Sequence, residues 1–365
     1  MSNDSTQHRC KVYLSDEGFG HIVRQRAVVE ELMRVLPSTQ VTVQTSVQAE
    51  TAQRYIECDH FIRRFNNILW DKQPNGSPDL TAITKRFSSY LETSNDYIKS
   101  ELSEYDYDFT ITDFVYEAFE VAAFKRVPAF GIAHFTWDWF FCKLYPPPLH
   151  TDVVRHFMKM AEQATRLYFP PFTPEEILHY HKGRAKEVPL ILRQSISPKK
   201  LHDDNRFKVL IMDSGAGVLA ESIRKALHTV KDLSDYIFYV SQKLYTQQDN
   251  VKAIPTEELM VDYVADMDLV IGRAGFNTIS ECVGLRTPML LIGEAMNPEM
   301  NENILMLKRQ HLGSFISMDT FERGLDKYLP AFIKHEYAFI KAEMQQHEIA
   351  TNGAEVIVQD ILNHL

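Results

Sequence analysis

Short apolar runs alternate with longer amphipathic stretches along most of the chain, and this alternation predicts its architecture. The apolar runs predict strands over residues 11–14, 41–45, 109–112, 129–133, 188–192, 208–212, 236–240, 269–271 and 288–292. The amphipathic stretches predict helices over residues 21–36, 48–55, 80–102, 114–125, 218–228, 257–265 and 276–283. Strands that alternate with helices need crossover connections, so we predict an α/β protein with doubly wound, mostly parallel sheets.

The alternation stops and restarts once in a way that indicates a domain boundary. The segment 194–206 is polar and contains Pro198, and a new apolar run follows it directly. With 365 residues, and roughly 150 residues per domain as a guide, the chain is long enough for two domains. We therefore predict an N-terminal domain over residues 1–193, a linker over 194–206 and a C-terminal domain over 207–353.

Composition and charge narrow the functional classes. Hydrophobic residues make up 45% of the chain and charged residues 24%, which is typical of a globular protein. The net charge of −10 gives no overall basic field, so a nucleic-acid partner is not favoured, although the pair Arg63-Arg64 leaves a local anionic contact open. The four cysteines form no CxxC pair, and neither a signal-like start nor a membrane-length apolar run is present. We expect a cytoplasmic protein without a transmembrane segment.

The loop after the strand at 269–271 is the most informative part of the sequence. A buried strand ends at small residues and a helix follows at once, so the N–H groups of the helix start face the crevice at the carboxyl edge of the sheet. A diphosphate suits this place, because Gly275 lets it approach the backbone and Thr278 adds a hydroxyl donor. Glu281, one turn further on, can accept both hydroxyls of a ribose. The alternative is that Gly275 only starts a helix and Glu281 is a surface charge.

A second polar cluster follows the next strand. Residues 293–303 are rich in carboxylates and amides, which recognise sugar hydroxyls by hydrogen bonds, and they follow the strand at 288–292. The alternative is an exposed loop that leads into the polar start of a helix.

These motifs resemble the donor-binding region of glycosyltransferases of the GT-B fold, especially those of family 28. The resemblance is carried by Arg273-Ala-Gly275, Thr278-Ile-Ser280-Glu281 and Glu299-Met-Asn301. It implies two facing Rossmann-like domains, with the acceptor in the first, the donor in the second, and the last helix, 354–365, crossing back to the first. It also implies that a nucleotide sugar is bound by Arg273, Gly275, Phe276, Asn277 and Thr278, its ribose by Glu281, and its sugar by Glu299 and Asn301. The family's Asp-Gln pair is replaced by Glu299 and Asn301 with one residue between them, which leaves the sugar open.

The N-terminal half resembles the same superfamily. Gly18-Phe-Gly20-His21, followed by Arg24, resembles its Gly-x-Gly-His-x-x-Arg start, and Phe135-Thr-Trp137-Asp138 is similar to the Phe-Ser-Trp-Asp of plant arabinokinases. The glycosyltransferase-like N-terminal part of arabinokinases thus resembles nearly the whole chain, although the match is poor over residues 146–183. The nucleotide-sugar hydrolase of pseudaminic acid synthesis is also similar.

His21 is the candidate general base, because a neutral imidazole can take the proton of an acceptor hydroxyl while backbone amides stabilise the leaving diphosphate. Alternatively, His21 binds phosphate or caps its helix, and Asp16 or Glu17 is the base. The remaining candidates for binding the diphosphate are loop residues: Gly18, Gly20, Ser214, Gly215 and Gly217. The candidates for binding an acceptor are Trp137 and Asp138, which lie in an aromatic stretch. The alternatives are a tight turn for the loop after 208–212 and core packing for the tryptophan helix.

No metal or other cofactor is expected. The chain has no Asp-x-Asp motif, and His179 and His181 lack a third ligand at metal spacing, so we interpret them as part of an exposed loop. The sequence thus predicts a metal-independent, inverting glycosyltransferase that takes a nucleotide-diphospho-sugar, UDP-linked by resemblance, and a hydroxyl acceptor. The alternatives are a nucleotide-sugar hydrolase or epimerase on the same fold, and a non-catalytic protein that binds sugar nucleotides.

Overall fold

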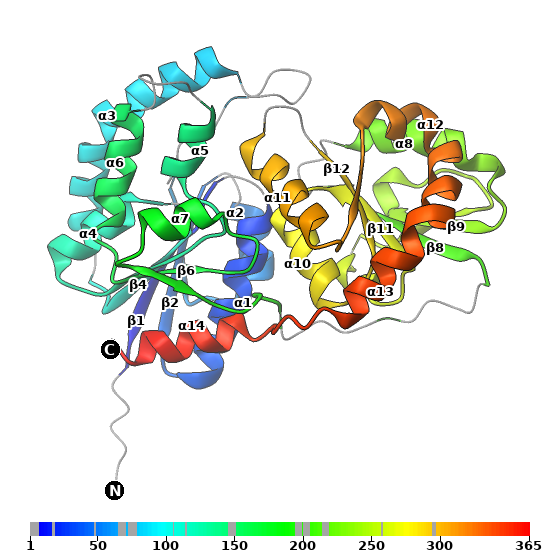
Figure 1. Ribbon diagram of the computed structural model, residues 1–365. Coiled ribbons are helices and arrows are strands. Elements are labelled where there is room, and N and C mark those ends of the chain that lie inside the picture. The colour runs from blue at the N-terminus through cyan, green and yellow to red at the C-terminus, as the bar shows by residue number, and fades with distance from the viewer. Residues whose placement is uncertain are drawn as a thin grey trace, which may run out of the picture. The chain divides into compact units, whose positions relative to one another are not determined.

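The computed structural model describes residues 7–16, 19–46, 49–64, 71, 79–104, 106–113, 115–144, 151–193, 199, 205–213, 219–256, 258–293 and 297–365 (Figure 1). The chain forms two compact units. Unit 1 consists of Met1–Arg193 with Thr351–Leu365, and unit 2 of Gln194–Ala350. Each unit is built on one sheet in which all strands are parallel, so the predicted doubly wound α/β architecture is confirmed.

The sheet of unit 1 has the strand order β3-β2-β1-β4-β5-β6-β7. Its strands are β1 (Arg9–Tyr13), β2 (Gln40–Thr45), β3 (His60–Arg63), β4 (Phe109–Thr112), β5 (Ala129–Ile132), β6 (Arg166–Phe169) and β7 (Ala185–Glu187). Val12 at the centre of β1 pairs with Val43 on one side and Ile111 on the other. Because the order reverses between β1 and β4, their carboxyl ends form the switch point at which α/β proteins bind ligands.

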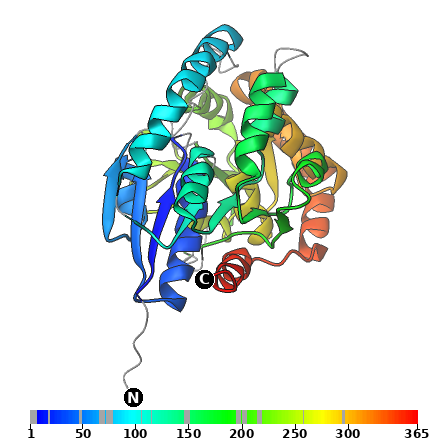
Figure 2. The ribbon, with the colours of Figure 1, turned by 90° about the vertical axis from the view of Figure 1, so that its left-hand side faces the viewer.

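Helices cover both faces of this sheet. One face packs against α1 (Phe19–Val35), α2 (Ala49–Tyr55) and α14 (Gly353–Leu362). The other packs against α3 (Leu80–Leu102), α4 (Glu117–Lys125), α5 (Trp137–Leu144), α6 (Thr151–Ala161) and α7 (Glu175–Tyr180). Figure 2 shows the long α3, in cyan, beside the blue strands β1 and β2. Side chains alternate between the faces, so Phe109 and Ile111 of β4 belong to the α1 side.

The last helix is fixed to unit 1 by close packing. Ile357 and Ile361 are fully buried in the same core as Val12. The Gly353 amide donates to the Leu190 carbonyl at 3.0 Å. A Cβ at residue 353 would lie 2.2 Å from the carbonyl oxygen of Pro189, so only glycine allows this approach.

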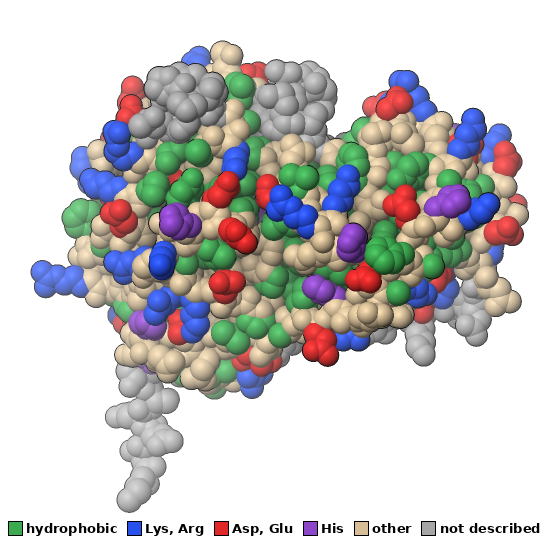
Figure 3. All heavy atoms as spheres, in the orientation of Figure 1, with side chains coloured by type: hydrophobic (Ala, Val, Ile, Leu, Met, Phe, Trp, Pro, Cys, Tyr) green, Lys and Arg blue, Asp and Glu red, His purple; other side chains and the backbone are tan. Residues whose placement is uncertain are grey.

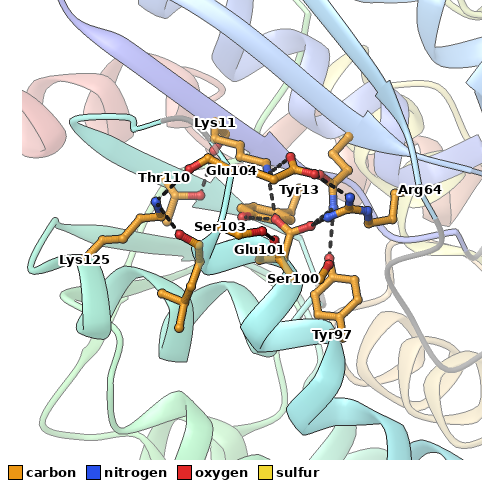
Figure 4. Close-up of polar contacts among 12 residues, drawn as sticks. Lys11, Tyr13, Arg64, Tyr97, Ser100, Glu101, Ser103, Glu104, Thr110 and Lys125 are labelled. Carbon is orange, nitrogen blue, oxygen red and sulfur yellow. Dashed lines mark hydrogen bonds and ion pairs between the residues drawn. The ribbon is translucent and has the colours of Figure 1, made fainter.

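On the α3 side, the centre of the sheet is polar (Figure 4). Glu101 of α3 receives hydrogen bonds from Lys11 Nζ at 2.6 Å and from the Tyr13 hydroxyl at 2.8 Å, and it also pairs with Arg64. Desolvation lowers the pKa of Lys11. Burial by itself raises the pKa of Glu101, but Lys11, Tyr13 and Arg64 outweigh it, so the net shift is downward. The network therefore holds ionised groups that fasten α3 to β1.

Unit 2 repeats the arrangement with the order β10-β9-β8-β11-β12-β13. Its strands are β8 (Phe207–Ile211), β9 (Tyr236–Ser241), β10 (Val251–Ile254), β11 (Leu269–Arg273), β12 (Met289–Ile292) and β13 (Ser314–Ile316). Its helices are α8 (Ala220–Thr229), α9 (Val261–Val264), α10 (Phe276–Gly284), α11 (Pro298–Arg309), α12 (Met318–Phe332) and α13 (Ala338–Gln346), with short helical turns at Val230–Asp232, Gln242–Leu244 and Ile333–Tyr337. Figure 1 shows α10 and α11 on one side of the sheet and α8 and α12 on the other. The order reverses between β8 and β11.

One strand prediction was wrong and others were missing. Residues 188–192 do not form a strand; β7 ends at Glu187, and only Ile191 makes an isolated bridge, to Asn352. Pro189 has no N–H to donate, which is unfavourable inside a ladder. The pattern also did not predict β3, β6, β7, β10 or β13, each of which is three or four residues long.

Across the part of the chain described above, no helix is long and apolar enough to cross a membrane. On the face shown in Figure 3, acidic and basic side chains are interspersed rather than gathered by sign.

Candidate active site

At the switch point of the unit 1 sheet, the first candidate residues lie in the loop after β1. Asp16 in this loop is 1% exposed, and its Oδ1 accepts hydrogen bonds from Thr45 Oγ1 and the Ser46 amide, both at 2.8 Å. These bonds tie the loop to the end of β2, so Asp16 has a structural role here. Glu17 and Gly18 lie outside the described residues. Gly20 is the second residue of α1.

His21, in the first turn of α1, contacts Asp113, which directly follows β4. The distance from His21 Nδ1 to Asp113 Oδ1 is 3.0 Å, and the two side chains are 13% and 0% exposed. An ionised carboxylate can only accept hydrogen bonds, so this contact places a proton on Nδ1 and the lone pair of the ring on Nε2. That tautomer is the one in which Nε2 can act as a base.

Arg24 lies one turn after His21 and binds the same carboxylate. Its Nη2 is 2.7 and 2.8 Å from the two oxygens of Asp113, and its Nη1 is 3.0 Å from Nδ1 of His134, which follows β5. Burial by itself raises the pKa of Asp113, but Arg24 and then His21 outweigh it and lower the value to about 2. The carboxylate is therefore ionised at neutral pH.

Sequence reasoning did not identify Asp113 or His134. The signal that was available is their position, because both are polar residues that follow an apolar strand at its carboxyl end, Asp113 after β4 beside β1 and His134 after β5 beside β4. The pairing itself joins residues 92 positions apart in the sequence, which no local pattern reveals.

The tryptophan helix is packed into the core of unit 1. Trp137 is 2% exposed and Asp138 is fully buried. Asp138 accepts a hydrogen bond from the Tyr116 hydroxyl at 3.2 Å and lies 3.2 Å from Nε2 of His181. This burial favours the core-packing alternative over a role of Trp137 and Asp138 in acceptor binding. The expectation of an exposed loop was wrong for His181, which is 6% exposed because Asp138 holds it in the core.

In unit 2, the turn between β11 and α10 is open toward solvent. Gly275 is the N-cap of α10, and a Cβ added there would meet nothing within 4 Å. The glycine cap brings no side-chain hydrogen bond to the start of α10, and helix starts are places where proteins bind anions. The buried ring of Phe276 anchors the helix start, while Asn277 and Thr278 are half-buried. Glu281 is 8% exposed and lies one turn after Thr278 on the same side of α10.

The helix α11 contacts the turn between β11 and α10. Asn303 is 2% exposed, and its amide donates to the carbonyl of Ala274, directly before Gly275, at 2.9 Å. Arg273 Nη2 lies 3.8 Å from the sulfur of Met300. In the same helix Glu299 is half-buried and Asn301 is exposed. The structure thus gathers the donor candidates of β11, α10 and α11 at one end of the unit 2 sheet.

The loop after β8 is described only at its ends. Asp213 accepts a hydrogen bond from the Leu219 amide at 3.1 Å, directly before α8. Ser214, Gly215 and Gly217 lie outside the described residues.

Two doubly wound parallel sheets are also the architecture of solved glycosyltransferases. The glycotransferase of kitacinnamycin matches with a TM-score of 0.68 over 99% of this chain and 100% of its own, at 14% identity. The glycosyltransferase SsfS6 of Streptomyces sp. SF2575, solved with thymidine diphosphate, matches with a TM-score of 0.59 over 98% and 99% at 13% identity. The GT-B fold predicted from the motifs is confirmed.

The sequence comparisons give the family. The model of glycosyl transferase family 1 matches residues 12–332, so the chain belongs to this family and is a glycosyltransferase. The chain is 34% identical over 177 residues to the UDP-N-acetylglucosamine–N-acetylmuramyl-(pentapeptide) pyrophosphoryl-undecaprenol N-acetylglucosamine transferase of Staphylococcus saprophyticus. That match covers 48% of this chain and 41% of the relative, so it spans less than half of the relative's length.

Proposed function

We propose that this glycosyltransferase moves a sugar from a nucleotide-diphospho-sugar to a hydroxyl acceptor, with inversion and without a metal ion. The observation that carries the proposal is the contact of His21 with the ionised Asp113 at the switch point of the unit 1 sheet. The contact leaves the His21 ring with its lone pair on Nε2, as a general base requires. Of the two alternative bases, Asp16 is already bound to Thr45 and Ser46, and Glu17 lies outside the described residues.

Unit 2 supplies the donor site in this proposal. The amides at the start of α10, the Thr278 hydroxyl and the Arg273 guanidinium bind the diphosphate, and Glu281 binds the ribose. The donor sugar contacts Glu299 and Asn301. Ser214, Gly215 and Gly217 complete the diphosphate site from the β8 loop. A UDP-linked donor is supported by the name of the Staphylococcus relative, and a nucleoside diphosphate by the ligand of SsfS6.

The reaction follows from these roles. His21 Nε2 accepts the proton of the acceptor hydroxyl while its oxygen attacks the anomeric carbon from the side opposite the diphosphate. The bond from the anomeric carbon to the diphosphate oxygen breaks, and the bonding electrons leave with the nucleoside diphosphate. The α10 amides and Arg273 stabilise the charge on this leaving group, which supports a reaction without a metal ion. The resemblance to arabinokinases and to the pseudaminic acid hydrolase rests on the motifs alone; with water as the acceptor, the same step would be hydrolysis.

Nucleotide binding tests the donor site. We expect one of UDP, GDP, dTDP, CMP and ADP to raise the melting temperature selectively, by the same amount with and without EDTA. Glu281→Ala should abolish this response, whereas Glu221→Ala, which removes an 81% exposed side chain of α8, should not. A stabilisation that EDTA removes would contradict the metal-free site, and no response to any nucleotide would overturn the proposal.

Turnover tests the base. With the nucleotide sugar that matches the bound nucleotide, His21→Ala should lower kcat about 10²- to 10⁴-fold and leave the Kd of the nucleotide unchanged. Product analysis separates transfer from hydrolysis, since free sugar forms without an acceptor only if water replaces it. Unchanged turnover in His21→Ala would exclude His21 as the base.

A further inference from the structure

We infer that Arg24 is a positioning residue for the His21 base and that it acts through Asp113. The inference rests on the proposed function, which assigns the base but gives Arg24 no role. Arg24 fixes which nitrogen of His21 carries the proton. Its positive charge also weakens the stabilisation that the Asp113 carboxylate gives to the protonated ring.

The distances around Arg24 indicate where the N–H groups of Arg24 and His21 point. Its side chain is 3% exposed, and Nη2, which carries two hydrogens, is 2.7 and 2.8 Å from the Asp113 oxygens but 3.1 Å from His21 Nδ1. A guanidinium has no acceptor and does not lose its proton in proteins. The shortest contacts of Nη2 are therefore those with the carboxylate, and the Nδ1 hydrogen of His21 donates to Asp113 Oδ1 at 3.0 Å. In the opposite tautomer, the Nδ1 lone pair would face the carboxylate at 3.0 Å, which is repulsive.

His134 supports the guanidinium from its other end. Because Arg24 Nη1 can only donate, the contact at 3.0 Å makes His134 Nδ1 an acceptor. The His134 ring is 4% exposed and stands edge-on to the ring of Phe135, with 4.9 Å between the ring centroids. Arg24 is thus held between two groups from neighbouring strand ends, Asp113 after β4 and His134 after β5.

The charges around His21 follow from this arrangement. During the reaction His21 becomes an imidazolium beside the carboxylate of Asp113 and the guanidinium of Arg24. Among the residues that the structure describes, Arg24 on its own helix and Asp113 after β4 contact His21, His134 after β5 contacts Arg24, and Asp16 in the β1 loop is engaged with β2. The guanidinium opposes part of the stabilisation that the carboxylate gives to the imidazolium. Arg24 therefore both orients Asp113 toward His21 and places a positive charge beside the ring that gains a proton in the reaction.

Imidazole nitrogen spectra test the inference without any turnover. In protein with ¹⁵N-labelled histidine, with His21 assigned by its loss in His21→Asn, we expect the Nδ1–H tautomer. Arg24→Gln keeps a donor but removes the charge, and should move the protonation midpoint of His21 upward by about one pH unit. Asp113→Asn removes the opposite charge and should move the midpoint downward. An Nε2–H tautomer, or an unchanged midpoint in either variant, would overturn the inference.

Kinetics tests the same point in the working enzyme. The acid limb of kcat/KM should move to higher pH in Arg24→Gln and stay in place in Arg24→Lys, which keeps the charge; the KM for the donor should not change. Arg26→Gln is the matched control, because Arg26 lies on the same helix but its side chain pairs with Glu30. An acid limb that moves equally in Arg26→Gln, or not at all in Arg24→Gln, would refute the role of Arg24.

The two sets of results separate the two proposals. If the unmodified enzyme turns over no nucleotide sugar but the His21 midpoint shifts as expected, the proposed function fails and the role of Arg24 stands. If turnover occurs and neither variant moves the midpoint, the function stands and the role of Arg24 fails. If Arg24→Gln does not fold, Arg24→Met, which keeps the length of the side chain and also removes its charge, replaces it in both measurements.

Discussion

Asn303 offers a sharp test of how the donor loop is built. Its side chain is 2% exposed and donates to the Ala274 carbonyl at 2.9 Å, directly before the glycine that starts α10. Asn303→Ala leaves that buried carbonyl without its partner, which costs about 1–3 kcal/mol. If about 2 kcal/mol of this fell on the loop conformation that binds the diphosphate, nucleotide Kd would rise about thirtyfold.

A matched control exists in the same unit. Asn250 is 3% exposed, precedes β10 at the amino edge of the sheet, and donates to the carbonyls of Val230 and Leu233 at 2.8 and 3.2 Å. Asn250→Ala should lower the melting temperature by about 2–4 °C for each kcal/mol lost, much as Asn303→Ala does, but at a distance from the donor loop. Only Asn303→Ala should weaken nucleotide binding.

Calorimetric titration of both variants with the nucleotide that stabilises the unmodified protein measures the effect. Two results would refute the reasoning. One is an unchanged Kd in Asn303→Ala beside a lowered melting temperature, which would make Asn303 a purely structural residue. The other is an equal loss of affinity in both variants, which would mean that affinity follows overall stability rather than this loop.

Three further predictions concern unit 1, each measured by urea unfolding. Lys11→Met removes a buried ammonium 2.6 Å from Glu101, which keeps Arg64 as its remaining cation, and should lower the free energy of unfolding by about 2 kcal/mol; Lys11→Met with Glu101→Leu should recover part of the loss. Burial raises the pKa of Glu117 to about 7, above its unfolded value, so its contribution to stability is lost as pH rises from about 5 to 8. Glu117→Gln should remove that loss, and an identical pH profile would contradict it. Gly131→Ala places a Cβ 2.5 Å from Leu167 Cδ2 and 2.8 Å from Phe119 Cζ, and should destabilise by about 1–3 kcal/mol; a neutral result would mean that these side chains move aside.

The sequence predicts those elements whose pattern is long or purely apolar. The helix at 80–102 and the strand at 109–112 have the predicted bounds, because one presents a regular apolar stripe and the other is buried on both faces. The strand β6 was missed because its four residues begin with Arg166 and lie between stretches rich in proline and charge. β3, with the pattern exposed, half-buried, half-buried, exposed, has no alternation to detect.

The site was predictable only in part, for a related reason. Glycine turns and the residues around them are local, so His21, Gly275 and Glu281 can be singled out from the sequence. The partner of His21 is not local, because β4 must first pair with β1 before Asp113 reaches the imidazole. His181 was misjudged for the same cause, since the contact with Asp138 that buries it spans 43 positions.

The docking of α14 has a consequence for the order in which the chain can fold during synthesis. The ribosome completes unit 2 before it makes residues 351–365, yet Ile357 and Ile361 fill the same core as Val12 near the start of the chain. Unit 1 therefore cannot complete its core until residues 351–365 leave the ribosome, and apolar surface beside α1 stays uncovered until then. Contacts so far apart along the chain form slowly and leave such surface open to aggregation or chaperones. Although its first strand is made at the start, unit 1 is expected to be the later of the two to reach its native core.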